Sequence, residues 1–333
     1  MDAQKNTTLE LLKLFASYMV VFIHVRFYGG FGTTMDALAR FAVPFFFLIS
    51  GFFSYKISSD KIKKRIKHIA HLLVFAVLCY TFFNIFMLLF DGDIDGIVPY
   101  FSEYLNLKTL IKLFVLNVPV SSLHLWYLFA MLYVYIVFCF VTVFNINEKV
   151  MFVVSFFLLS LQILLGECLS AFGVVLGISI VRNFALMGIP FFVLGLFVKK
   201  YENRFRTIPN QVPVIAIVLG GLESILSRHF LGKSELYIGS LFILFAFVII
   251  WMKYSNIKLP RFFDVLSGCS TYIYIFHIMI SQIIIKIYAL LHLDYSSSAF
   301  LVNIHPIIVC IGSTVLAYFI VQIKNKNSLK KKM

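Results

Sequence analysis

Charged residues are scarce in this chain of 333 residues. They make up 13% of it, against 61% hydrophobic residues, whereas a soluble protein needs about a quarter of its residues charged to cover its surface. The mean hydropathy is +0.95. This composition excludes a water-soluble globular protein and an intrinsically disordered one, and it predicts an integral membrane protein.

Acidic residues and cysteines are few as well. Fifteen acidic residues face 29 basic ones, which gives a formal net charge of +14. The cysteines lie at separate points in or beside apolar segments, without paired or metal-ligand spacing, at Cys79, Cys139, Cys168, Cys269 and Cys310. The sequence therefore predicts neither a disulfide scaffold nor a metal site.

Long apolar runs fill most of the chain. Because about 17 to 25 apolar residues span a bilayer as a helix, we expect ten transmembrane helices, near residues 9–26, 37–55, 68–90, 124–144, 150–167, 182–198, 212–227, 235–252, 269–290 and 303–322. The sequence predicts an all-α, polytopic membrane protein in which residues 1–333 form a single transmembrane domain. Residues 323–333 form its basic cytoplasmic tail.

Basic residues gather in alternate connections between these runs. If the N-terminus is cytoplasmic, 20 of the 29 basic residues fall in inside segments and seven in outside segments. The positive-inside rule then predicts that both termini are cytoplasmic. We therefore interpret the net charge as topology and attraction to anionic lipids, and not as a nucleic-acid-binding surface.

The first apolar run carries three ionisable residues, Glu10, Lys13 and His24. An ionisable group inside a span costs a few kcal/mol, which makes it a candidate for function. The eleven-residue step from Lys13 to His24 returns to within about 20° of the same helix face and covers about 16 Å. That face would link the cytoplasmic boundary with the outer half. Alternatively, Glu10 and Lys13 pair with each other at the interface, and His24 is a boundary residue.

Six short motifs follow one another along the apolar runs. The first is the set Glu10, Lys13 and His24, spaced by three and then eleven residues. The others are the aromatic run Arg40–Phe53, which contains Pro44 and Ser50-Gly51; the basic turn Lys63-Lys64-Arg65; His124–Leu128; Ile189–Gly195; and Ser270–His277. In this ordered set the chain resembles acyltransferase family 3. It departs from the family at Lys13, where arginine is usual, because lysine cannot grip a phosphate or carbonyl bidentately.

The resemblance implies an O-acyltransferase of the bacterial cell membrane. Such a protein moves an acetyl or other short acyl group from cytoplasmic acetyl-CoA, a co-substrate rather than a permanently bound cofactor, to a hydroxyl of an extracytoplasmic carbohydrate. Transfer to an alcohol needs a base, and the ordinary pKa of histidine lies nearest neutral pH. His24 is the candidate, either as general base or as transient acyl carrier, with Glu10 as the second catalytic residue.

Donor and acceptor contacts are expected at opposite ends. For the donor, a cytoplasmic polyanion, the candidates are Lys13, Ser50, Lys63, Lys64 and Arg65, although topology alone explains basic residues there and close helix packing explains Ser50-Gly51. For the acceptor they are Arg40, His124, Trp126, Tyr127 and Glu223. We expect Arg40 near the outer end of its span, and Glu223 to pair with Arg40 or Lys13. An aromatic belt also explains Trp126 and Tyr127, and His277 is expected to hydrogen-bond within the bundle.

A second class of function stays open. An exporter or carrier of a polysaccharide, a lipid-linked glycan or a small molecule also places charges inside a polytopic bundle. The shared face of Lys13 and His24 distinguishes the two classes, because acyl transfer across the membrane needs it and a carrier does not.

Overall fold

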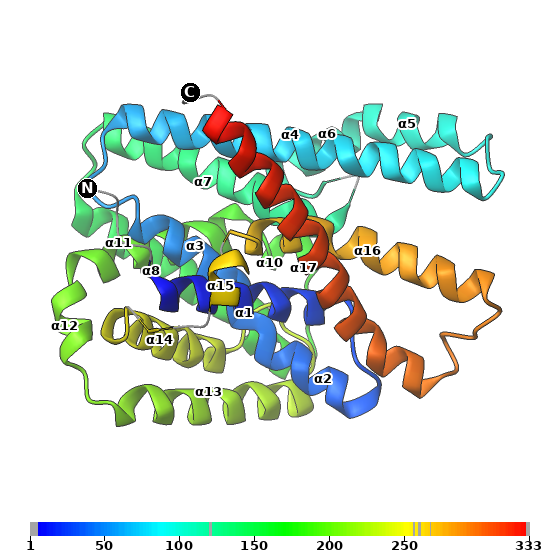
Figure 1. The fold of residues 1–333 in the computed structure, drawn as a ribbon. Coiled ribbons are helices and arrows are strands. Elements are labelled where there is room, and N and C mark those ends of the chain that lie inside the picture. Colours follow the sequence, from blue (N-terminus) through cyan, green and yellow to red (C-terminus); the bar gives the residue numbers. More distant parts are fainter. Residues whose placement is uncertain (1–5, 120–121, 256, 259–260, 267, 331–333) are drawn as a thin grey trace. The chain divides into compact units, whose positions relative to one another are not determined.

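The computed structural model describes residues 6–119, 122–255, 257–258, 261–266 and 268–330 (Figure 1). Within these ranges the chain is all-helical, as its composition predicts, and contains no β-strand. The helices are α1 (Thr7–His24), α2 (Gly29–Leu38), η1 (Ala39–Phe41), α3 (Ala42–Phe52), α4 (Ser59–Phe90), α5 (Ile97–Leu105), α6 (Leu107–Leu116), η2 (Leu123–Leu125), α7 (Trp126–Val143), α8 (Glu148–Ile163), η3 (Leu164–Cys168), α9 (Leu169–Ala171), α10 (Ile178–Val181), η4 (Phe184–Gly188), α11 (Ile189–Lys200), α12 (Glu202–Thr207), α13 (Gln211–Phe230), α14 (Ile238–Lys253), α15 (Arg261–Leu266), α16 (Ser270–Leu290) and α17 (Ala299–Lys330).

Nine helical segments of the described chain are long and apolar enough to cross a membrane. They are Thr7–His24, Gly29–Phe52, Ser59–Phe90, Leu123–Val143, Glu148–Ala171, Ile178–Lys200, Gln211–Phe230, Ser270–Leu290 and Ala299–Asn327. The run expected at 235–252 is α14, a helix of only 16 residues. It begins late because a turn precedes it, in which the Ser234 hydroxyl donates to the Leu236 carbonyl at 2.8 Å. The chain is a multi-pass membrane protein.

Three segments differ from the sequence-based expectation. The second span begins at Gly29 rather than at residue 37, and the 3-10 turn η1 interrupts it. Arg40, expected near the outer end of its span, therefore lies near the middle of the segment Gly29–Phe52. The basic turn expected at Lys63-Lys64-Arg65 lies instead in the first turns of α4, because lysine and arginine continue a helix readily. The tail expected at 323–333 continues α17 as far as Lys330, and residues 331–333 lie outside the described ranges.

The chain forms two compact units, which we call the first unit (residues 1–46 and 201–333) and the second unit (residues 47–200). In the first unit α1 packs on α16, α16 on α17, and α13 on α14. Buried Val21, Ile273 and Val309 meet between α1, α16 and α17. The Asn6 side chain begins α1 by accepting the Leu9 N–H at 3.0 Å, which satisfies one of the free amides of the first turn.

In the second unit α4 packs on α7, α8 packs on α11, and α3 approaches α11 closely. A methyl group added to Gly51 would lie 1.8 Å from the Phe192 carbonyl oxygen. One added to Gly195 would lie 2.0 Å from the Leu48 carbonyl oxygen. Only glycine permits this backbone contact, so small-residue packing explains Gly51 in the Ser50-Gly51 pair.

Candidate functional site

Glu10 and Lys13 form an ion pair near the start of α1. Lys13 Nζ lies 2.6 Å from Glu10 Oε1, and the two side chains are 25% and 20% exposed. The other carboxylate oxygen of Glu10 accepts the Gly268 N–H at 3.3 Å. The partly open helix end therefore carries a lysine whose head group is held by its own helix, as the i, i+3 spacing predicts.

His24 and His277 meet at the other end of α1. Their ring centroids are 5.3 Å apart with an interplanar angle of 42°, and His277 is fully buried. Its Nδ1 lies 2.8 Å from the Tyr274 carbonyl oxygen. A carbonyl only accepts, so Nδ1 carries the hydrogen and the Nε2 of the neutral ring keeps its lone pair. The expected hydrogen bond of His277 within the bundle is confirmed, and it runs to the backbone of its own helix.

A buried ion-pair network begins two residues after His24. We call it the Asp36 network, and its members are Arg26, Asp36, Arg40 and Glu235. Arg40, 3% exposed in η1, places Nη2 2.5 Å from Asp36 Oδ1 and Nη1 2.9 Å from Glu235 Oε2. Arg26 Nη2 lies 3.7 Å from Asp36 Oδ2. Two carboxylates thus compensate the buried guanidinium of Arg40, which would otherwise be strongly destabilising.

The Asp36 network also affects its surroundings. Burial, followed by the positive charge of Arg40, lowers the pKa of Lys233 in the α13–α14 connection. Arg40 Nε has no hydrogen-bond partner among the described residues. Sequence reasoning missed Asp36 and Glu235 as members of a site. The signal available for Asp36 is its i, i+4 spacing from Arg40 in an otherwise apolar stretch.

Glu223 has partners other than those expected. It accepts a hydrogen bond from the Ser227 hydroxyl at 2.9 Å and another from the Gly239 N–H. The prediction that it pairs with Arg40 or Lys13 is wrong, because Gly239 lies in the first turn of α14, where free backbone N–H groups attract a carboxylate. Glu223 therefore ties α13 to α14.

The basic residues at the start of α4 divide into two kinds. Arg65 donates to the Phe53 carbonyl at 2.7 Å and to the Ser54 hydroxyl at 2.7 Å, and it lies 3.3 Å from the Tyr135 hydroxyl. It thereby fixes the turn between α3 and α4. Lys63 and Lys64 are exposed, and Lys63 lies 3.9 Å from Asp60. The two lysines reach solvent, whereas the arginine is committed to its own chain.

The remaining candidates of the second unit are enclosed by protein. The hydroxyl groups of Ser50 and Tyr127 share a hydrogen bond. The Arg182 guanidinium lies 5.1 Å from the ring centroid of Trp126, which is buried. His124, also buried, places Nδ1 2.5 Å from the Ser122 hydroxyl. The candidates thus form two sets: Glu10, Lys13, His24, Arg40 and Glu223 belong to the first unit, and Ser50, Lys63, Lys64, Arg65, His124, Trp126 and Tyr127 belong to the second.

The spans and the polar groups buried between them define a polytopic membrane protein with titratable groups at both ends of its first helix. The chain belongs to the acyltransferase domain family, acyltransferase family 3, which it matches over residues 6–322, nearly its whole length. It is therefore a membrane acyltransferase. No curated protein and no solved structure matches the chain.

Proposed function

We propose that the protein transfers an acetyl or other short acyl group from cytoplasmic acetyl-CoA to a hydroxyl of an extracytoplasmic carbohydrate, in the bacterial cell membrane. The observation that carries this proposal is the contact between His24 and His277, with ring centroids 5.3 Å apart. It supplies a base at one end of α1, while Lys13 supplies a cation at the other. The family supplies the reaction class.

His24 acts on the acceptor hydroxyl. As general base it removes the hydroxyl proton while the oxygen attacks the thioester carbonyl; the C–S bond then breaks and the thiolate takes the proton back from the imidazolium. As acyl carrier, its nitrogen attacks the thioester carbonyl, the C–S bond breaks, and the thiolate leaves with the imidazole proton. The acceptor hydroxyl then attacks the acyl carbon, the C–N bond breaks, and the imidazole takes up the hydroxyl proton. His277 positions the His24 ring in either route, because its own Nδ1–H is committed to the Tyr274 carbonyl.

The donor enters from the cytoplasmic end. In the first unit, Lys13 contacts the phosphates of coenzyme A, and Glu10 acts through Lys13 by holding its ammonium group at 2.6 Å. Lys13 and His24 are about 16 Å apart along the helix, so the extended pantetheine arm can carry the thioester from one to the other. The second unit has its own donor candidates: Lys63 and Lys64 reach solvent, whereas Arg65 fixes the turn after α3 and Ser50 hydrogen-bonds to Tyr127.

The acceptor binds at the outer end. Arg40 lies in the Asp36 network, whose Arg26 is two residues from His24, and its positive charge favours the oxyanion that develops on the carbonyl oxygen. Trp126 and His124 are buried in the second unit, and Tyr127 hydrogen-bonds to Ser50, so we assign these three residues a packing role in that unit and no direct contact with the sugar. Glu223 acts through the packing of α13 on α14.

The test is acyl transfer by the purified protein in proteoliposomes, with radiolabelled acetyl-CoA and a surface-glycan fraction. His24→Ala should lower the transfer rate about 10²- to 10⁴-fold without changing the unfolding temperature. The matched control is His229→Ala, which removes an exposed histidine of the same unit. Wild-type-like transfer by His24→Ala contradicts the assignment, and glycan movement without acyl transfer in the wild type favours a carrier instead.

A further inference from the structure

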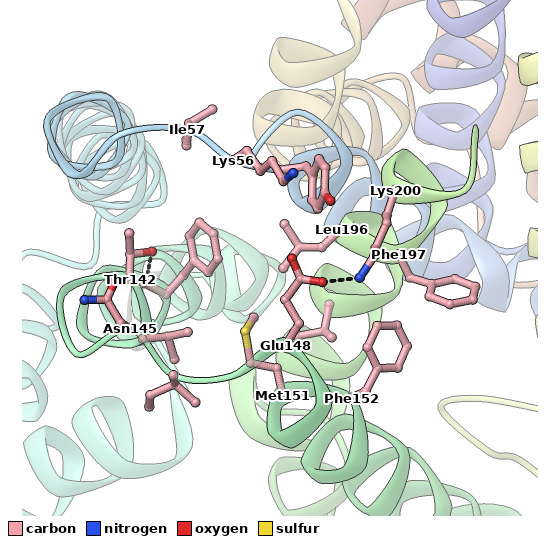
Figure 2. A pocket seen from close by; sticks show the side chains of 15 residues that line it. Lys56, Ile57, Thr142, Asn145, Glu148, Met151, Phe152, Leu196, Phe197 and Lys200 are labelled. Carbon is pink, nitrogen blue, oxygen red and sulfur yellow. Dashed lines mark hydrogen bonds and ion pairs between the residues drawn. The ribbon is translucent and has the colours of Figure 1, made fainter. Parts of the chain in front are cut away.

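A cavity of about 330 Å³ lies within the second unit and is lined by none of the residues assigned above (Figure 2). It is formed where four helices begin or end: the turn after α3, the end of α7, the start of α8 and the end of α11. Its volume falls in the lower part of the range of ligand sites, about 300 to 1,000 Å³. The cavity is therefore large enough for a ligand group.

The walls of the cavity are mainly apolar. Phe138 of α7, Met151 and Phe152 of α8, and Leu196 and Phe197 of α11 line it. The rings of Phe152 and Phe197 pack edge to face with their centroids 4.8 Å apart. Such walls suit a hydrocarbon chain, whereas a free phosphate would gain nothing from them.

Basic side chains accompany the apolar walls. Lys56, Glu148 and Lys200 line the cavity, and Lys200 forms an ion pair with Glu148 (Figure 2). The segments 55–58, 145–152 and 193–200 together hold four lysines, including Lys149 and Lys199, and one acidic residue. The net charge of these segments is positive, so this end of the second unit attracts an anion.

Lys56 lines the cavity and forms no ion pair with a carboxylate in the described part of the chain. Its ammonium group lies over the Tyr55 ring, with Nζ 5.4 Å from the ring centroid. Its backbone adopts a left-handed conformation with φ at 53°, which a side chain other than glycine rarely adopts unless its surroundings require it. Asn145, with φ at 50°, also lines the cavity, but it follows the end of α7, where that conformation is common.

We propose that this cavity binds an anionic phospholipid of the inner leaflet, with its phosphate at Lys56 and one acyl chain against Met151, Phe152 and Phe197. Four lysines mark this end as cytoplasmic by the positive-inside rule, and the cytoplasmic leaflet holds the anionic lipids. The apolar walls select the lipid over soluble phosphates, and the lysine selects an anionic head group over a zwitterionic one. The Glu148–Lys200 pair leaves Lys200 partly neutralised.

Native mass spectrometry of the full-length detergent-purified protein can test this site. The probes are dioleoyl phosphatidylglycerol and dioleoyl phosphatidylcholine, which share the same chains. We expect Lys56→Gln to lower phosphatidylglycerol binding at least fivefold and to leave phosphatidylcholine binding unchanged. The matched control is Lys149→Gln, an exposed lysine at the same end that does not line the cavity. Glu148→Gln should strengthen phosphatidylglycerol binding, because it frees Lys200.

A further variant and a competitor separate this site from other sources of binding. Met151→Trp fills the cavity without changing charge and should weaken phosphatidylglycerol binding, while Lys56→Gln remains decisive if that variant fails to fold. Equal losses with Lys56→Gln and Lys149→Gln would show diffuse attraction and overturn the proposal. Equal binding of the two lipids by the wild type would overturn it too, as would displacement of the lipid from this site by coenzyme A.

Discussion

At the scale of single residues, Asp36 is a fully buried carboxylate that holds two arginines. Asp36→Asn leaves Arg40 with a single carboxylate in a buried site. Because breaking a buried ion pair typically costs about 3 to 5 kcal/mol, we expect the free energy of unfolding to fall by about that amount. Thermal unfolding of the detergent-purified protein, followed by fluorescence, measures it.

The control for this prediction is an exposed ion pair. Glu202→Gln removes the pair between Glu202 and Arg206, whose side chains are 22% and 44% exposed. An exposed pair contributes about 0 to 1 kcal/mol, so the unfolding temperature should barely move. If Asp36→Asn changes it no more than Glu202→Gln does, the Asp36 network does not stabilise the first unit.

Lys13 is the proposed contact to coenzyme A on α1. We expect Lys13→Ala to weaken coenzyme A binding about tenfold or more, the loss of one charge-assisted hydrogen bond, with little change in the rate of the bound complex. Lys13→Arg should preserve or strengthen binding, because a guanidinium can bind a phosphate through two hydrogen bonds. Calorimetric titration with coenzyme A checks both variants. If Lys13→Ala binds coenzyme A with unchanged affinity, Lys13 does not contact the donor and its role is limited to the ion pair with Glu10.

At the scale of helices, Gly51 fixes how closely α3 and α11 pack. A methyl group at this position would lie 1.8 Å from a backbone oxygen, so Gly51→Ala must push the two helices apart. Overpacking of this kind typically costs about 1 to 3 kcal/mol, and we expect a lower unfolding temperature by the same thermal assay.

A second glycine provides the control for helix packing. Gly221 lies inside α13, and a methyl group there would meet only the Leu38 side chain, at an ordinary 3.5 Å. Gly221→Ala should be neutral or stabilising, since alanine is favoured over glycine in a helix by about 1 kcal/mol. A larger loss of stability in Gly221→Ala than in Gly51→Ala would be inconsistent with close packing of α3 on α11.

Helix existence could be predicted from the sequence far better than helix length. Apolar composition locates the spans because it determines the free energy of transferring a segment from water into lipid. It does not report local turns, so the 3-10 turn at Ala39–Phe41 and the late start of α14 at Ile238 were missed. The start of α14 follows a local turn held by the hydrogen bond from Ser234 to Leu236, and Arg40 in η1 pairs with Asp36 and Glu235. The basic turn expected at Lys63-Lys64-Arg65 is helical instead, because charge alone does not distinguish a loop from the first turns of a helix.

The candidate site was predictable where its residues share one helix. The face that holds Glu10, Lys13 and His24 follows from helical periodicity, and the Glu10–Lys13 pair from its spacing. The partners of Arg40 and Glu223 were not predictable, because they depend on how α2, η1, α13 and α14 pack in the first unit. Glu235 reaches Arg40 from a distant part of the chain, and a single sequence contains no signal for such a contact.

At the scale of the whole molecule, the family match extends over both units, and the proposed reaction begins on one side of the membrane and ends on the other. α1 alone carries the proposed donor contact, Lys13, and the proposed base, His24, about 16 Å apart along its axis. The proposed reaction therefore moves the acyl group from the side of Lys13 to the side of His24, whatever the identity of the acceptor.

The most direct test of this claim uses sealed proteoliposomes whose protein orientation is known from thiol labelling of single cysteines. Radiolabelled acetyl-CoA is supplied only on the side of the basic segment 61–67, and a surface-glycan fraction is placed on both sides in separately recoverable forms. We predict that label appears on the glycan across the membrane from the donor, and that His24→Ala abolishes it. Label only on glycan from the donor's own side would contradict transfer across the membrane.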